Sequence, residues 1–447
     1  MKTKRNLIQI CLLGAVLLQA ATNEAQPVTK IAAANYHSLF LKSDGSLWAM
    51  GRNWLGELGD GTFNQTNHPE LIVASNGTAI AVGELHSLFL KSDGSLWGMG
   101  YNQSGQLGDG TFNNANRPEQ IMASNVTAIA GGYQHSLFLK SDGSLWAMGR
   151  NQWGQLGDGT YSSFISLHGT NLPEQIVASN VTAIAAGFNH SLFLKSDGSL
   201  WAMGDNDRGQ FGGGSLYETN RPALIVASNV TAIAAGDIFS LFLKSDGSLW
   251  GMGYNVAGGL GDGTYNNTNR PEQIVAGNIK VFVAGYSDTL YLTSDGSLWD
   301  TGWNSYGQLG DGTYNNTNRF EQIVASGVTT MAVGGHSLFL KSDGSLWGMG
   351  LNSYGQLGDG TTNNVNSPEL ILAAYNQISA QPLNGGNIQL SFVGIAGANY
   401  ALDRSFSLAP PNWVPQVTNP ANSFGALVFT HTPSPATNNF WRIRSVP

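Results

Sequence analysis

Charged residues and cysteine are both scarce in this chain. Only 11% of the 447 residues are charged, and the single cysteine is Cys11. An average soluble protein carries roughly 25% charged residues. The low charge does not predict disorder, because 42% of the residues are hydrophobic and can form a sizeable core.

The hydrophobic run at the N-terminus is too short to span a bilayer. It covers residues 7–18, follows Lys2, Lys4 and Arg5, and precedes small polar residues. This order is typical of a secretory signal peptide, here residues 1–25, and the alternative is a buried N-terminal strand. We therefore expect a secreted or cell-surface protein, or a periplasmic one, with no membrane span. The mature chain would have no cysteine, which excludes disulfides and thiol chemistry.

Positive charge is in short supply as well. The formal net charge is −8, and it becomes −10 when the signal takes away three positive charges and one negative charge. No basic run is present. Because phosphate neutralisation supplies most of the affinity for nucleic acid, we expect no nucleic-acid partner.

A repeat of about fifty residues dominates the rest of the sequence. The string SDGSLW begins at Ser43, Ser92, Ser141, Ser196, Ser245, Ser294 and Ser342. A period of this length predicts a propeller or a solenoid.

Each repeat contains four short runs of β character and no helical periodicity. In the second repeat they cover residues 78–83, 86–92, 95–100 and 118–124. The side chains of the first run are small enough for an innermost strand. The fourth run opens with Pro118, a residue type that belongs at the edge of a sheet. The Asp-Gly pair between the second and third runs predicts a hairpin with positive φ at both residues. The pattern predicts an all-β fold, a seven-bladed β-propeller of four-stranded blades over residues 26–372.

Residues 128–160, AIAGGYQHSLFLKSDGSLWAMGRNQWGQLGDGT, resemble the repeat of the regulator of chromosome condensation family. The shared signature is A-x-G-x-x-H-S-L, D-G-x-x-W and G-x-N-x-x-G-Q-L-G-x-G; kelch repeats have a similar period but a different glycine pattern. The resemblance implies a seven-bladed propeller. It does not transfer a function, since the founding member is a nuclear nucleotide-exchange factor and other relatives are secreted bacterial propellers.

Residues 373–447 depart from the repeat. They contain strand-like runs separated by turns rich in Pro and Asn. We expect a small C-terminal β-sandwich-like domain.

The repeated polar residues are interpreted as scaffold. His37 recurs in four other repeats but is replaced by Phe239 and Asp288, so we expect it to order the loop between the first two strands. The neighbouring serine points to the opposite face of its strand and cannot pair with it. The Asp of LGDGT fits a turn better than a calcium site, and the Lys that precedes six of the seven hairpins fits a solvated rim. We expect no catalytic residue, metal or cofactor.

The repeats differ from one another in two stretches, the pair before the His and the residues around the Asn of G-x-N-x-x-G. Alternating strand direction places both stretches at one end of the propeller, here called the variable face. Trp, Tyr and Arg dominate binding hot spots. The candidate binding residues are Arg52, Trp54, Tyr101, Arg150, Trp153, Tyr254, Trp303, Tyr306 and Tyr354.

Packing between neighbouring blades is the alternative role for these aromatic residues. Trp48, Trp97 and Trp146 belong to the repeated strand, and we expect them to be buried between blades. The sequence favours a secreted, non-enzymatic binding or scaffold propeller that recognises a protein or a glycan. The alternatives are an exported carbohydrate-active enzyme with its site at the axis, for which no convincing acidic pair is evident, and a structural surface-layer component.

Overall fold

The structure is a computed structural model that describes residues 26–163 and 169–372, followed by six C-terminal strands. The chain divides into two compact units, residues 26–375 and a unit that contains residues 376–447. The predicted signal peptide lies outside the described residues.

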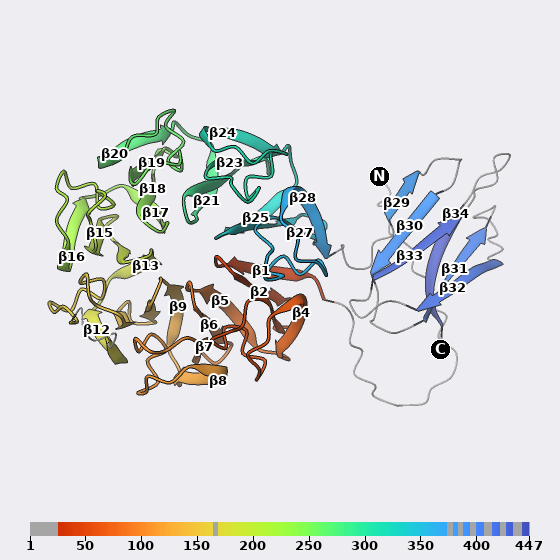
Figure 1. Ribbon diagram of the computed structural model, residues 1–447, viewed down its shortest axis with the longest axis horizontal. Helices are drawn as coiled ribbons and strands as arrows, with labels where there is room; N and C mark the ends of the chain where they lie inside the picture. Colours follow the sequence, from red (N-terminus) through yellow and green to blue (C-terminus); the bar gives the residue numbers. More distant parts are fainter. Residues whose placement is uncertain are drawn as a thin grey trace, which may run out of the picture. The chain divides into compact units, whose positions relative to one another are not determined.

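Residues 26–375 form a ring of seven antiparallel blades (Figure 1). Each blade has four strands that lie in sequence order from the axis outward, which confirms the predicted propeller. The innermost strands are β1 (Val28–Ala33), β5 (Gly77–Val82), β9 (Val126–Gly131), β13 (Val181–Ala186), β17 (Val230–Ala235), β21 (Ile279–Ala284) and β25 (Val328–Val333). The second strands are β2 (His37–Lys42), β6 (His86–Lys91), β10 (His135–Lys140), β14 (His190–Lys195), β18 (Phe239–Lys244), β22 (Asp288–Thr293) and β26 (His336–Lys341).

The third and fourth strands complete each blade. The third strands are β3 (Leu47–Gly51), β7 (Leu96–Gly100), β11 (Leu145–Gly149), β15 (Leu200–Gly204), β19 (Leu249–Gly253), β23 (Leu298–Gly302) and β27 (Leu346–Gly350). The outer strands are β4 (Thr66–Val73), β8 (Ala115–Met122), β12 (Thr170–Val177), β16 (Thr219–Val226), β20 (Thr268–Val275), β24 (Thr317–Val324) and β28 (Val365–Leu372). Pro118 lies inside β8 rather than at its start, and it is tolerated there because β8 is an edge strand.

The hairpin between the second and third strands differs from the prediction. Gly94 has a φ of 76°, but no Asp of these hairpins is among the described residues with positive φ. Gly94 N donates to Lys91 O at 2.9 Å, and Lys91 N donates to Ser95 O at 3.0 Å, so the turn ends in a glycine bulge. Asp93 Oδ1 instead accepts the Ser95 N–H at 2.9 Å, which fixes the turn without a left-handed Asp.

Apolar side chains fill the interfaces between blades. Leu39 and Leu41 of β2 pack against Phe89 and Met99 of the next blade, and all four are buried. Phe40 points to the other face of β2 and packs with the preceding blade. A sheet covered on both faces explains why the second and third strands are apolar at nearly every position.

The strand tryptophans are only half-buried, contrary to the prediction. Trp97 stacks on Phe89 at a ring distance of 6.2 Å, and the ammonium group of Lys91 lies 3.8 Å from the Trp97 ring centre. Trp48 and Trp146 have the same arrangement. The repeated Lys therefore covers an indole ring by a cation–π contact instead of standing free in solvent.

The first and last blades meet directly, so the ring is closed. Ser38 Oγ of the first blade lies 2.6 Å from His336 Nε2 and donates to Gln356 O at 2.7 Å, both in the last blade. Every blade is built from one continuous repeat.

The C-terminal unit consists of two three-stranded antiparallel sheets. Leu390, Phe392, Leu402, Leu427 and Phe429 form its buried core together with Tyr400. This arrangement confirms the expected small β domain. Its strands are β29 (Ser379–Pro382), β30 (Ile388–Val393) and β33 (Ala426–His431) in one sheet, and β31 (Asn399–Ser405), β32 (Val414–Pro420) and β34 (Phe440–Val446) in the other. In the part of the chain that the structure describes, no helix has the length and hydrophobicity to span a bilayer.

Candidate functional site

The repeated His and Ser form hydrogen bonds from blade to blade. His37 Nε2 lies 2.9 Å from Ser87 Oγ of the next blade, and Ser87 Oγ donates its proton to Glu57 O at 2.8 Å. Because the hydroxyl proton is already used, the imidazole acts as the donor and not as a base. Burial lowers the pKa of His86 and of His135 to about 3, which keeps both neutral. The His thus joins blades rather than ordering its own loop as predicted, and no nucleophile is activated.

Two of the seven interfaces lack this bond, and both flank the sixth blade. At one of them Phe239 replaces the His and faces the blade that carries Thr289. At the other, Asp288 replaces the His and is fully buried, and neither carboxylate oxygen has a hydrogen-bond partner among the described residues. Burial raises the pKa of Asp288 to about 8. The buried carboxyl of Asp300 on the adjacent strand has a pKa well above its usual value, mainly through burial and then through the charge of Asp288.

The Asp of LGDGT closes a turn. Asp109 Oδ1 accepts hydrogen bonds from Asn102 Nδ2 at 3.0 Å and from Thr111 N at 2.8 Å. These bonds occupy the oxygens that a cation would need. Among the residues with described positions, no three His, Cys, Asp or Glu side chains are grouped as a metal ion would require.

Backbone hydrogen bonds bring the two variable stretches together in each blade. In the third blade Arg150 N donates to Gln134 O at 2.8 Å, and the other blades repeat this bond. Gly149 makes the approach possible, because a Cβ at this position would lie 2.5 Å from Gln134 O and its φ is 104°. The two stretches therefore lie at one end of the ring, as strand direction predicted.

The first and last blades contribute one aromatic cluster to the variable face. Tyr354 contacts Tyr36 and Trp54 edge-on at ring distances of 5.3 and 5.2 Å. The Arg52 guanidinium lies 4.4 Å from the Tyr36 ring and forms an ion pair with Glu57 at 3.0 Å. Trp54 remains 56% exposed, so it is the most accessible member of the cluster.

The other candidate residues are less accessible than the sequence suggested. Trp303 packs on Tyr306 at 5.1 Å, and Arg150 donates to Gln134 Oε1 at 3.2 Å. Each is half-buried, as are Trp153, Tyr254 and Tyr354, whereas Arg52 and Tyr101 are buried at 8% exposure. The contacts of Trp303 and Arg150 lie within single blades, whereas Tyr354 packs between the last and first blades. Packing thus accounts for part of this set, and Arg52 and Tyr101 offer little free surface.

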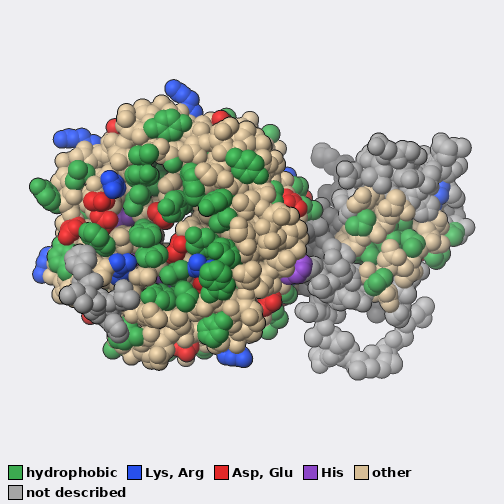
Figure 2. All heavy atoms as spheres, viewed as in Figure 1, with side chains coloured by type: hydrophobic (Ala, Val, Ile, Leu, Met, Phe, Trp, Pro, Cys, Tyr) green, Lys and Arg blue, Asp and Glu red, His purple; other side chains and the backbone are tan. Residues whose placement is uncertain are grey.

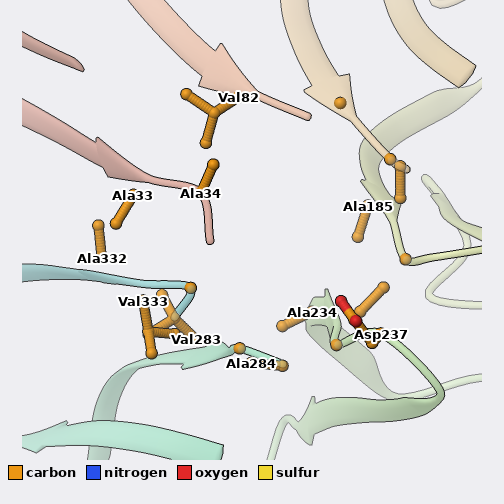
Figure 3. Close-up of a pocket in the computed structure, with 18 of the residues that line it drawn as sticks. Ala33, Ala34, Val82, Ala185, Ala234, Asp237, Val283, Ala284, Ala332 and Val333 are labelled. Carbon is orange, nitrogen blue, oxygen red and sulfur yellow. The ribbon is translucent and has the colours of Figure 1, made fainter. Parts of the chain in front are cut away.

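The axis of the ring holds a channel of about 390 Å³ (Figure 3). Small residues of the innermost strands, including Ala33, Ala185 and Ala234, line its wall. Figure 2 shows an opening at the axis with hydrophobic, acidic and basic side chains around it. The loops between first and second strands add a ring of larger side chains, here called the channel mouth: Asn35, Glu84, Tyr133, Phe188, Asp237 and Tyr286.

Two carboxylates face the channel mouth, and the choice of candidate residues from sequence missed both. Burial raises the pKa of Glu84, although the hydrogen bond from Asn35 Nδ2 at 2.5 Å opposes this shift. Burial raises the pKa of Asp237 well above its usual value, and the charges of Glu84 and Asp288 raise it further. The sequence signal for both was the variable residue two positions before the repeated His position, which holds Phe239 in the fifth blade.

A second set of exposed aromatic residues was missed as well. Phe63, Tyr161, Tyr265 and Tyr314 follow the Gly-Thr of LGDGT and are 48–53% exposed. They belong to the connections between third and fourth strands, which start at the variable face. Their regular spacing in the sequence, directly after LGDGT, could have identified them as a set.

A closed ring of seven repeat-built blades with one variable end defines the chain as a repeat β-propeller. The chain belongs to the family of proteins with the regulator of chromosome condensation (RCC1) repeat, since the repeat matches more than half of it. One description of the repeat matches residues 28–56, 78–106, 126–155, 181–210 and 230–258, and another matches residues 44–90, 93–139, 142–194, 197–243 and 343–388. These segments leave out residues 259–342, which contain the sixth blade.

Solved structures with this fold share little sequence with the chain. Human WBSCR16 is 22% identical, with a TM-score of 0.66 over 75% of this chain and 96% of that one. Prp20p from Saccharomyces cerevisiae is 21% identical, with a TM-score of 0.67 over 76% of this chain and 90% of that one. At this identity the likeness extends to the fold alone. No curated protein matches the sequence.

Proposed function

We propose that this propeller is a non-enzymatic scaffold that binds a protein partner through its variable face. One observation carries the proposal: the aromatic and Arg side chains that differ between repeats gather at one end of the ring, whereas the SDGS hairpins at the other end are nearly identical. A surface that recognises one partner needs differences between blades, and Trp, Tyr and Arg are the residues that dominate such surfaces.

Relatives with this fold support a protein partner. The structure of yeast Prp20p was described together with its binding properties to Gsp1p and histones, and another structure shows Kap60 bound to yeast RCC1 (Prp20). These partners belong to the yeast protein. They support the proposal because a protein with this fold binds other proteins.

Truncation of Trp54 tests the proposal. A protein and glycan array probed with the mature chain identifies the partner, and calorimetric titration then compares variants. We expect Trp54→Ala to weaken binding about thirtyfold, near 2 kcal/mol, because an exposed indole at a hot spot loses its contact area. The melting temperature should change little, since the side chain is 56% exposed.

Lys91→Ala, at the hairpin end, is the matched control and should leave binding intact. If Lys91→Ala or Asp93→Ala abolishes binding while Trp54→Ala does not, the partner uses the opposite end of the ring.

A carbohydrate-active enzyme is the second candidate, because Glu84 and Asp237 give the channel mouth two carboxylates with raised pKa values. A raised pKa suits a general acid. The channel wall argues against a sugar site, since its side chains are mostly Ala, Val and Ile and offer few hydrogen bonds. Hydrolysis of a glycoside panel that disappears in Asp237→Asn would favour the enzyme.

We also propose that the chain is exported, on the basis of its basic, apolar and small-residue N-terminal order. N-terminal sequencing of the protein recovered outside the cytoplasm should give a first residue between 21 and 26. Recovery of material that begins at Met1 would contradict export by this signal.

A further inference from the structure

The channel mouth contains two acidic side chains that have no ion-pair partner in the described part of the chain. Glu84 belongs to the second blade and Asp237 to the fifth, and neither forms an ion pair with another residue in the described ranges. Asn35 donates one hydrogen bond to Glu84, whereas the Asp237 carboxylate has no hydrogen-bond partner among the described side chains and lines the channel. Burial raises the pKa of Glu84 and the charge of Arg52 opposes this rise, but the Arg52 guanidinium is already paired with Glu57.

Three aromatic side chains line the channel together with the two acids. Tyr133 and Phe188 stack at a ring distance of 4.0 Å, and Tyr286, which is 40% exposed, belongs to the sixth blade. The faces of aromatic rings attract cations, and they do so most strongly where water is displaced. Carboxylates and aromatic faces together are the set that recognises an ammonium or guanidinium group.

The cavity has room for such a group. Its volume of about 390 Å³ falls within the range of small-ligand sites, about 300–1,000 Å³. The wall of Ala33, Ala185 and Ala234 is apolar (Figure 3), so the charged contacts are confined to the mouth. Apolar surroundings lower the local dielectric constant and strengthen the attraction between a carboxylate and a cation.

We propose that the channel mouth binds an organic cation, the ammonium or guanidinium group of a Lys or Arg side chain that the protein partner presents. The proposal rests on the function proposed above and specifies the chemistry at its centre. A bound cation favours the ionised form of Glu84 and Asp237, which then supply charge complementarity. Tyr133, Phe188 and Tyr286 supply cation–π contacts, and the surrounding variable face contacts the rest of the partner.

Small cations test the site directly. The mature chain is titrated with n-butylguanidinium and n-butylammonium chloride at constant ionic strength, with butan-1-ol as the neutral analogue, and binding is followed by ligand-observed NMR. We expect saturable millimolar binding of both cations and none of butan-1-ol. The double variant Glu84→Gln, Asp237→Asn should bind at least tenfold more weakly. Its melting temperature should equal or exceed the parent's, because both substitutions keep side-chain shape and remove carboxyl groups whose pKa burial raises.

Asp142→Asn removes a carboxylate at the hairpin end and should leave cation binding unchanged. An acetylated peptide with a central Arg should bind at least as well as n-butylguanidinium. Equal binding of butan-1-ol, unchanged binding by the double variant, or exclusion of the peptide overturns the proposal.

Trp54→Ala separates this proposal from the proposed function, because Trp54 does not line the channel. The variant should bind the small cations like the parent. If it also binds the protein partner like the parent, the proposed function fails while the cation site remains. If it loses the partner and the parent binds no cation, the cation site alone fails.

Discussion

Deletion of one complete repeat, residues 225–273, should abolish the cooperative folding of the ring. The remaining six repeats would keep their hairpins, but the first and last blades could no longer meet at the geometry of the Ser38–His336 contact. A closed propeller depends on every interface, whereas a linear repeat array tolerates removal of a unit.

The size of the expected loss in stability follows from the number of apolar side chains that one interface between blades buries. Between the third and fourth blades, eight buried apolar residues form one cluster, among them Leu137, Phe193 and Met203. At about 1.5–3 kcal/mol for each large side chain, one open interface forfeits about 10 kcal/mol or more. The total stability of a typical domain is about 5–15 kcal/mol, so an open ring should not persist.

Thermal melts and small-angle scattering measure this outcome. We expect the deletion variant to lose its sharp transition and its compactness. Removal of residues 376–447 is the matched control, because they belong to the other compact unit, and it should leave the ring's transition in place. A deletion variant as compact and as stable as the parent would mean that the repeats behave as a linear stack.

The blade architecture could be predicted because the same pattern of four strand-like runs recurs seven times in the sequence. The alternation of Leu and Phe around residues 86–91 requires two covered faces, and the small residues of β5 suit the axis. The ends of the predicted strands in the second repeat differ from the observed ones by at most three residues. Ring closure also follows from the count of repeats.

The partners of repeated polar residues could not be predicted from one repeat alone. His37 bonds to a serine fifty residues away because successive blades stand face to face, and sequence adjacency contains no such information. The same limitation explains the strand tryptophans. Lys91 and Trp97 meet across the hairpin only once the register pairs Phe89 with Trp97.

The variable face could be located from strand direction, but its accessible surface could not. The sequence pattern predicts Trp54 and Arg52 as binding residues for the same reason, yet Trp54 is 56% exposed and Arg52 is 8% exposed. Arg52 is covered by Tyr36 and paired with Glu57 of its own blade, and the repeat pattern does not show these contacts. Glu84 and Asp237 were overlooked because they lie in different blades and converge only at the axis.

The sixth blade should give a large gain in stability from one substitution. Asp288 has a raised pKa of about 8 in the folded chain and an ordinary pKa of 3.8 when exposed. Between these two pKa values, Asp288 binds fewer protons in the unfolded chain than in the folded chain. Its contribution to the free energy of unfolding therefore falls as the pH rises. The penalty grows by about 1.4 kcal/mol per pH unit above pH 4.

Asp288→Asn removes this penalty and keeps the side-chain shape. We expect the variant to exceed the parent in free energy of unfolding by about 4 kcal/mol at pH 7, and by close to zero at pH 4. Neighbouring acids with raised pKa values, Asp300, Asp237 and Glu84, contribute to both proteins and affect the difference less. Guanidinium chloride denaturation at half-unit pH steps from 4.5 to 8 gives the difference directly.

The buried His residues change the free energy of unfolding with pH in the opposite direction to Asp288, and this provides an internal check on the Asp288 prediction. Burial lowers the pKa of His86 to about 3, so the unfolded chain gains a proton below about pH 6.5 that the folded chain cannot accept. Stability from this source is present above pH 6.5 and is lost as the pH falls, in the parent and in Asp288→Asn alike. The parent should therefore be most stable near pH 6.5. Below this pH, His protonation in the unfolded chain lowers the free energy of unfolding, and above it the Asp288 carboxyl does so.

Asp246→Asn, in an exposed hairpin, should change the pH dependence of stability neither below nor above pH 6.5. A gain from Asp288→Asn that is the same at pH 5 and pH 8 would mean that Asp288 is already ionised in the folded blade, with a counter-charge at the interface of the sixth and seventh blades.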